Sequence, residues 1–206
     1  MIHWLQCENK EKCFEKTFLI ESQTRTLPSI FWQGSSPSEK KPLVLLAHGG
    51  SGHKRSEKMI AMGLKLSKDF GWNAVSIDGP AHGDRGTVKQ ITDPAYHEMW
   101  RRQYVVEEMM EDWKCVIDEF VSHDSIDQEN LGFWGLSMGI MFGITFIASD
   151  ARIKSSVLGK SGLTGSSSQR SGVRPYFEEF APKIHQPILF SMQWDDERFD
   201  REGQLE

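Results

Sequence analysis

The sequence has 206 residues, of which 38% are hydrophobic and 26% charged, a composition typical of a folded globular protein rather than a disordered one. Its formal net charge of −5 argues against a nucleic-acid partner, because binding to phosphates requires a basic surface. No apolar run approaches the roughly 18 residues that span a bilayer, and the N-terminus lacks the pattern of a secretory signal. We therefore expect one cytoplasmic domain over residues 1–206, without a membrane partner.

The cysteine pattern gives no sign of a metal site or of a disulfide framework. Cys7, Cys13 and Cys115 cannot all pair with one another, and no Cys-x-x-Cys spacing indicates zinc. Reduced thiols are the expected state in a cytosolic protein. We predict neither a bound metal nor a cofactor.

The first part of the chain alternates between apolar and polar residues over residues 14–20 and 27–32. This alternation, interrupted by a polar stretch, predicts two antiparallel strands joined by a turn. Residues 33–38 have the composition of a surface loop. The continuous apolar run over residues 43–47 predicts a strand that is buried on both faces.

From there, helical and strand patterns alternate along the chain. Helices are predicted over residues 59–70, 106–120 and 138–148, and strands over residues 72–77, 131–134, 153–158 and 188–192. Gly71 is placed to end the first of these helices. The alternation predicts the α/β class, a mostly parallel sheet with helices on both faces, entered through antiparallel N-terminal edge strands.

A serine between two glycines, Gly135-Leu136-Ser137-Met138-Gly139, comes directly after the predicted strand over residues 131–134. This is the pattern of a nucleophile elbow, in which the turn strains the serine backbone and side chains at the glycine positions would clash with the neighbouring chain. The pattern alone is weak, because small residues cluster by chance. Its place between a strand and a helix favours Ser137 as a catalytic nucleophile.

Other candidate residues follow the other strands, because ligand sites in open α/β sheets lie beyond the carboxyl ends of the strands. After residues 43–47 comes His48-Gly49-Gly50, and we predict that the amides of Gly50 and Met138 form an oxyanion hole. After residues 188–192 come Asp195 and Asp196, which are both placed to orient a catalytic histidine.

A third loop, Asp78-Gly79-Pro80-Ala81-His82-Gly83-Asp84, follows the predicted strand over residues 72–77. Its glycines and proline suit a tight turn. For His82, a role in ordering this loop is favoured over a role as a catalytic base.

In their chain order, and with Pro187-Ile188-Leu189-Phe190 leading to the two aspartates, these motifs resemble those of the α/β-hydrolases. The resemblance is greatest to the esterase and dienelactone-hydrolase-related branch, and it extends from about the first predicted strand to the chain end. It implies the α/β-hydrolase fold with Ser137 as the nucleophile. It favours a carboxylester substrate, because founding dienelactone hydrolases have a cysteine as nucleophile. It also selects Asp196 over Asp195, because the family's acid lies three residues past a glycine that Gln193 replaces.

The same resemblance places the catalytic histidine after one further strand, a few tens of residues beyond the acid. The sequence ends at Glu206, so we expect the last strand, the histidine and the closing helix to be missing from it. The first hypothesis is therefore a serine esterase that is represented here by an incomplete chain. Two alternatives stay open: a catalytically inactive binding or interaction protein on the same fold, and a base supplied instead by His48 or His82.

Overall fold

The computed structural model describes residues 1–22, 24–34 and 39–206, which contain one eight-stranded sheet in the spatial order β1-β2-β3-β5-β4-β6-β7-β8. The strands are β1 (Ile2–Asn9), β2 (Cys13–Glu21), β3 (Thr26–Gly34), β4 (Lys41–Ala47), β5 (Asn73–Ile77), β6 (Ile126–Leu136), β7 (Ile153–Gly159) and β8 (Ile188–Ser191). The pairings from β1 to β5 are antiparallel, and those from β5 through β4 to β8 are parallel. The sequence prediction of a mostly parallel sheet with an antiparallel edge is confirmed.

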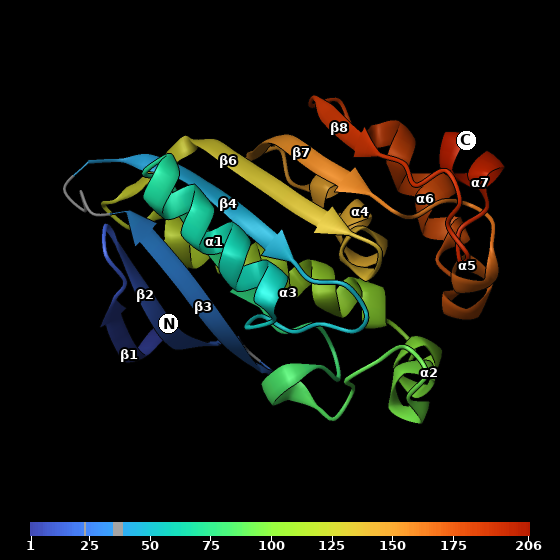
Figure 1. Ribbon diagram of the computed structural model, residues 1–206, viewed down its shortest axis with the longest axis horizontal. Helices are drawn as coiled ribbons and strands as arrows, with labels where there is room; N and C mark the ends of the chain where they lie inside the picture. Colours follow the sequence, from blue (N-terminus) through green and yellow to red (C-terminus); the bar gives the residue numbers. More distant parts are fainter. Residues whose placement is uncertain (23, 35–38) are drawn as a thin grey trace.

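Helices cover both faces of this sheet, as predicted. They are α1 (Glu57–Asp69), α2 (Pro94–Arg101), α3 (Val105–Val121), α4 (Met138–Ser149), α5 (Ser166–Ser171), α6 (Arg174–Phe180) and α7 (Arg201–Leu205). Figure 1 shows α1 in front of the sheet and α3 and α4 behind it, while α2 and α5 lie beyond the ends of the parallel strands. In the described part of the chain, no helix has the length and apolar character needed to cross a membrane.

The two faces of the sheet pack against their helices in different ways. On the face covered by α3 and α4 (Figure 1), the Trp113 ring of α3 meets Phe133 of β6 edge-on, with ring centroids 5.7 Å apart. On the opposite face (Figure 1), α1 lies so close to β3 that a Cβ atom on Gly63 would be 2.3 Å from the Trp32 ring. Burial of these aromatic side chains supplies much of the driving force for folding.

The structure differs from the sequence prediction near the N-terminus and in the short helices α2, α5 and α6, which were not predicted. The strand β1 was not predicted. Gln33 and Gly34 are buried residues of β3 rather than parts of a surface loop, and the rest of that predicted loop, residues 35–38, lies outside the described residues. The strand β6 begins earlier than predicted, at Ile126. Gly71 follows Phe70, the C-cap residue of α1, and has a left-handed φ of 68°, as the prediction of a helix end requires.

Candidate active site

Ser137 is the single residue between the end of β6 and the start of α4. Its φ of 55° and ψ of −124° are strained for a residue with a side chain. The turn is held from both sides. The Ser137 N–H donates to the Gly159 carbonyl at 2.9 Å, and the N–H groups of Ile140 and Met141 donate to the Ser137 carbonyl at 3.0 and 3.1 Å. The side chain therefore stands at a fixed position beyond the sheet.

The two flanking glycines are required by close approach of the backbone. A Cβ atom on Gly135 would lie 2.9 Å from the carbonyl carbon of Gly139, and one on Gly139 would lie 2.5 Å from the Ala47 carbonyl oxygen. Real Cβ contacts are essentially never this short. The predicted clash at both flanking positions is confirmed, so the sequence pattern has the geometry of a nucleophile elbow.

The glycine loop after β4 lies beside this serine. Ala47 pairs with Gly135 in the parallel ladder, and a Cβ atom on Gly49 would be 3.9 Å from the Ser137 Cβ atom. Among the described residues, no acceptor forms a hydrogen bond with the Gly50 N–H. The N–H of Met138, at the first position of α4, has no partner within the helix. The N–H groups of Gly50 and Met138 are thus available near Ser137 as hydrogen-bond donors to a ligand.

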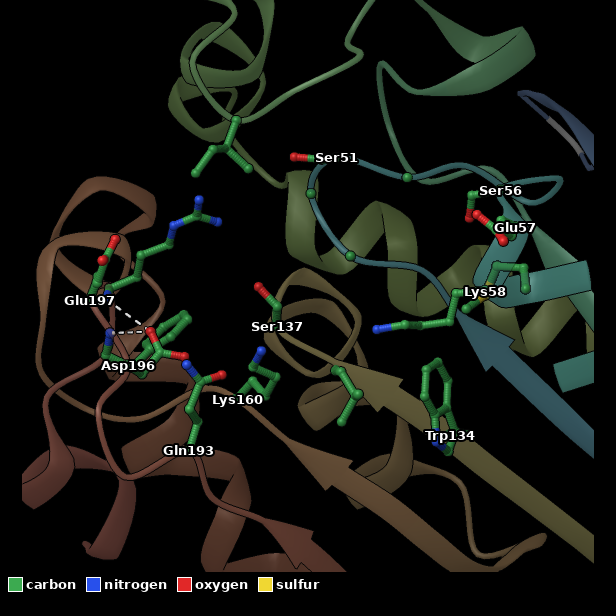
Figure 2. A pocket seen from close by; sticks show the side chains of 18 of the residues that line it. Ser51, Ser56, Glu57, Lys58, Trp134, Ser137, Lys160, Gln193, Asp196 and Glu197 are labelled. Carbon is green, nitrogen blue, oxygen red and sulfur yellow. Dashed lines mark hydrogen bonds between the residues drawn. The ribbon is translucent and has the colours of Figure 1, made fainter. Parts of the chain in front are cut away.

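The turn after β8 reaches the same place because β8 pairs with β7. Gly159 is opposite Ser191, and the Lys160 N–H donates to the Ser191 carbonyl at 3.0 Å. In this turn, Asp196 is half-buried, and its Oδ1 atom accepts hydrogen bonds from the N–H groups of Arg198 and Phe199 at 2.8 and 3.2 Å, drawn as dashed lines in Figure 2.

Asp195, the other candidate acid, lies in the same turn. Its side chain is exposed and makes no hydrogen bond within the described residues. Asp196 is therefore the more firmly held of the two carboxylates.

These elements enclose a cavity of about 740 Å³. It is lined by Gly49, Gly50, Ser51, Gly52, Ser56, Glu57, Lys58, Met59, Ile91, Trp134, Leu136, Ser137, Lys160, Gln193, Asp195, Asp196, Glu197, Arg198 and Phe199. Figure 2 shows Ser137 between Asp196 on one side and Lys58 on the other. Of the four predicted site residues, Gly50, Ser137 and Asp196 line the cavity, and Met138 is buried directly after Ser137.

None of the seven histidines lines this cavity, and all seven are among the described residues. Their places are His3 in β1, His48 and His53 in the loop after β4, His82 after β5, His97 in α2, His123 after α3 and His185 before β8. The Nδ1 atom of His53 accepts a hydrogen bond from the Arg55 N–H at 3.2 Å.

His48 and His82, the two candidates for an alternative base, are buried and bonded to backbone groups. Burial lowers the pKa of His48 to about 4, so its ring is neutral at neutral pH. Its Nδ1 atom donates to the Gly49 carbonyl at 2.8 Å, and its Nε2 atom accepts from the Gly79 N–H at 2.8 Å. Both ring nitrogens of His82 face carbonyl oxygens. Neither histidine has a free nitrogen for Ser137.

Sequence reasoning missed two lysines and one glutamine at this site. Lys58 and Lys160 extend into the cavity (Figure 2), and Lys160 has a left-handed φ of 54°. Gln204 of α7 bonds to the backbone of the turn that carries Asp196. No spacing in the sequence marks these residues, because their positions depend on tertiary packing. Within the described residues, no group of three or more His, Cys, Asp or Glu side chains is arranged to hold a metal ion.

The chain is similar to several solved structures. It is 32% identical to a cold-adapted esterase from an Arctic intertidal metagenomic library, solved as a PEG-bound complex; the match covers 98% of this chain and 82% of that one, with a TM-score of 0.83. Two further structures share the fold. One is a putative dienelactone hydrolase from Klebsiella pneumoniae, with 18% identity, a TM-score of 0.76, and a match that covers 94% of this chain and 78% of that one. The other is a putative acetyl xylan esterase from Bacteroides fragilis, with 15% identity, a TM-score of 0.71, and a match that covers 93% of this chain and 62% of that one.

Comparison with protein-family models and with curated proteins finds no match. The strand order and the elbow geometry define the class, which is that of the α/β hydrolases. With the identity and coverage of the Arctic esterase, the chain belongs to the α/β-hydrolase superfamily and is a hydrolase.

Proposed function

We propose that this hydrolase cleaves small carboxylesters through an acyl-enzyme on Ser137. The observation that carries the proposal is the strained backbone of Ser137, which holds its side chain in a 740 Å³ cavity beside the amides of Gly50 and Met138. The similar Arctic protein is an esterase, which supports an ester substrate for this chain. The serine in place of a cysteine favours a carboxylester over a dienelactone.

In the proposed reaction, the Ser137 Oγ atom attacks the ester carbonyl carbon while a histidine takes the hydroxyl proton. The carbonyl oxygen becomes an oxyanion, which the N–H groups of Gly50 and Met138 stabilise. The bond to the alcohol then breaks, the alcohol leaves with that proton, and the acyl group remains on Ser137. A water molecule then attacks the acyl carbon while the same histidine takes its proton, the bond from this carbon to Ser137 Oγ breaks, and the histidine returns the proton to Oγ as the acid leaves.

Asp196 is the proposed acid that accepts the ring hydrogen bond of this histidine and stabilises its cationic form. Its fixed Oδ1 atom and its half-buried side chain support this role over Asp195, which lines the same cavity but is exposed. Because no histidine of residues 1–206 lines the cavity, we propose that the base comes from outside these residues. Reading the coding sequence past codon 206 tests this: an in-frame strand followed by a histidine supports the proposal, and a stop codon contradicts it.

Covalent labelling tests the nucleophile directly. In protein that carries the proposed histidine from outside residues 1–206, a fluorophosphonate probe should label the wild type and the Ser51→Ala variant, and should fail to label Ser137→Ala. Ser51 is the matched control because it is a serine of the same cavity wall without the elbow geometry. Equal labelling of all three proteins would reject Ser137 as the nucleophile.

The alternative is a catalytically inactive binding or interaction protein that retains the α/β-hydrolase fold. The observation that favours it is the absence of any of the seven histidines from the cavity wall. A wild-type chain that neither reacts with the probe nor hydrolyses a p-nitrophenyl ester, with the reading frame closed after Glu206, would establish this alternative.

A further inference from the structure

His82 joins the loop after β5 to the glycine loop beside Ser137. Its side chain is fully buried, and its ring meets two carbonyl oxygens: Nδ1 lies 2.7 Å from the Pro80 oxygen, and Nε2 lies 3.0 Å from the Gly50 oxygen. The first partner belongs to the same loop as His82. The second belongs to the glycine loop, so this contact connects two loops that follow different strands.

The direction of these hydrogen bonds follows from the chemistry of the partners. A carbonyl oxygen only accepts, so a ring nitrogen that bonds to it must donate a hydrogen; a neutral ring has one N–H and donates to one of the two carbonyls, and only a doubly protonated ring donates to both. In either case both nitrogens face carbonyl oxygens. A nitrogen that donates in this way cannot take a proton from Ser137. The geometry of His82 is therefore that of a residue that holds the loop and not that of a catalytic base.

Fixing a carbonyl also fixes an amide, because a trans peptide is planar and its C=O and N–H groups point in opposite directions. The Gly50 carbonyl, held by His82, sets the direction of the Ser51 N–H. The preceding peptide is held in the same way, since the Gly49 carbonyl accepts from His48 Nδ1 at 2.8 Å and from the Gly52 N–H at 2.9 Å. That second anchor sets the direction of the Gly50 N–H.

These anchors matter because glycine peptides rotate more freely than others. Gly50 is also confined on its other side, where a Cβ atom would lie 2.8 Å from Ile91 and 2.9 Å from the Tyr96 ring. The Tyr96 ring meets His82 edge-on, with centroids 6.0 Å apart. The peptides on both sides of Gly50 are thus held in one orientation before any substrate binds.

We propose that His82 is a positioning residue: its Nε2–Gly50 bond fixes the peptide that follows Gly50 and, together with the His48 anchor on the preceding peptide, keeps the Gly50 N–H in the orientation that binds the oxyanion. The proposal rests on the proposed function of Ser137 and Gly50. It adds a role for a histidine that does not touch the substrate. Losing the anchor should reduce turnover more than substrate binding, because the amides act mainly on the oxyanion of the transition state.

Two variants separate the two bonds of the ring. In His82→Gln the side-chain N–H₂ group is placed near the former Nε2 atom and can still donate to Gly50. In His82→Asn it is placed near the former Nδ1 atom and can donate only to Pro80. Both variants replace the ring with a polar amide, so any effect of losing the ring itself is the same in both and cancels in the comparison.

Hydrogen exchange of the peptide that contains residues 49–52 is then measured, together with the kinetics of p-nitrophenyl ester hydrolysis by protein that carries the proposed histidine from outside residues 1–206. We expect faster exchange in His82→Asn than in His82→Gln, with kcat lowered about 10- to 100-fold in His82→Asn and KM changed little. Equal exchange and equal kcat in the two variants would overturn the proposal. If Ser137 proves not to be the nucleophile, the proposed function fails, and the exchange comparison still decides whether His82 holds the loop.

Discussion

The side-chain amide of Gln204 bonds to both backbone groups of Gln193. Its Oε1 atom accepts from the Gln193 N–H at 3.2 Å, and its Nε2 atom donates to the Gln193 carbonyl at 2.9 Å. The same Nε2 atom donates to the Phe199 carbonyl at 3.1 Å. One buried side chain of α7 therefore holds both ends of the turn that carries Asp196.

Replacing Gln204 with alanine should loosen this turn. The variant leaves the N–H of Gln193 and two carbonyls without these partners, and we expect a loss of about 1–3 kcal/mol in the free energy of unfolding, measured by urea denaturation. Fluorophosphonate labelling of Ser137 should also slow, because the cavity wall around Asp196 loses its support.

The matched control for this prediction is Gln186→Ala. Gln186 also donates from its side chain to a backbone carbonyl, that of Ile147, at 2.8 Å, but it does not line the cavity. We expect this control to lose stability and to keep the wild-type labelling rate. Identical labelling rates in the two variants would show that Gln204 stabilises the fold but does not affect the reactivity of Ser137.

The glycine positions around the elbow give a second prediction. A Cβ atom on Gly139 would lie 2.5 Å from the Ala47 carbonyl oxygen, a backbone atom that cannot rotate away. In Gly132, also in this segment, the nearest atoms to an added Cβ are 3.7 Å away, which is ordinary contact. Gly139→Ala should therefore displace the elbow, lower the melting temperature and abolish labelling of Ser137. Gly132→Ala should keep labelling close to wild type; equal loss of labelling in both would contradict this explanation.

Strands and motifs were predictable where local chemistry dominates. The parallel strand β4 contains a continuous apolar run because helices cover both faces of the sheet (Figure 1), and the elbow glycines are required by close backbone contacts. The strand β1 was not predictable in this way. It is an edge strand whose residues are mostly exposed, with Trp4 and Leu5 among them, so its sequence carries no buried periodicity.

The candidate site was predictable only as an order of motifs along the chain. That order placed Gly50, Ser137 and Asp196 at one edge of the sheet, and the structure brings them to one cavity. The hydrogen bonds that hold them come from residues distant in sequence, such as His82 for Gly50 and Gln204 for Gln193. Such side-chain-to-backbone bonds depend on how the loops pack, and no local pattern records them.

A third prediction concerns the buried ion pair between Lys54 and Asp78. The Lys54 Nζ atom lies 2.7 Å from Asp78 Oδ2, and both side chains are excluded from water. Removing the ammonium in Lys54→Met leaves a buried carboxylate without its counter-charge, and we expect a loss of about 3–5 kcal/mol by urea denaturation. Adding Asp78→Asn to this variant should restore part of that loss, because it removes the unpaired charge.

A surface pair provides the comparison for this ion pair. The Lys65 Nζ atom lies 3.0 Å from Asp69 Oδ2 on α1, and the two side chains are 61% and 54% exposed. Lys65→Met should change the free energy of unfolding by less than about 1 kcal/mol, because water already screens this pair. A Lys54→Met effect as small as that of Lys65→Met would show that burial does not strengthen the inner pair.

The burial of His48 predicts how stability changes with pH. The pKa of His48 is lowered to about 4 by burial, whereas a histidine in the unfolded chain has a pKa of about 6.5. As pH falls below about 6.5, the unfolded chain takes up a proton that the folded chain does not bind until about pH 4. The contribution of His48 to stability is therefore fully present above pH 6.5 and is lost between pH 6.5 and about 4, by an amount on the order of 3 kcal/mol.

This dependence is measured by urea denaturation of the wild type and of His48→Gln between pH 7.5 and 4.5. The carboxylates contribute to both curves, so the difference between the two proteins isolates the histidine. We expect the wild type to lose more stability than the variant over this range. His185→Gln, which replaces an exposed histidine before β8, should follow the wild-type curve. Parallel curves for the wild type and His48→Gln would mean that the folded chain accepts the proton on His48 as readily as the unfolded chain does.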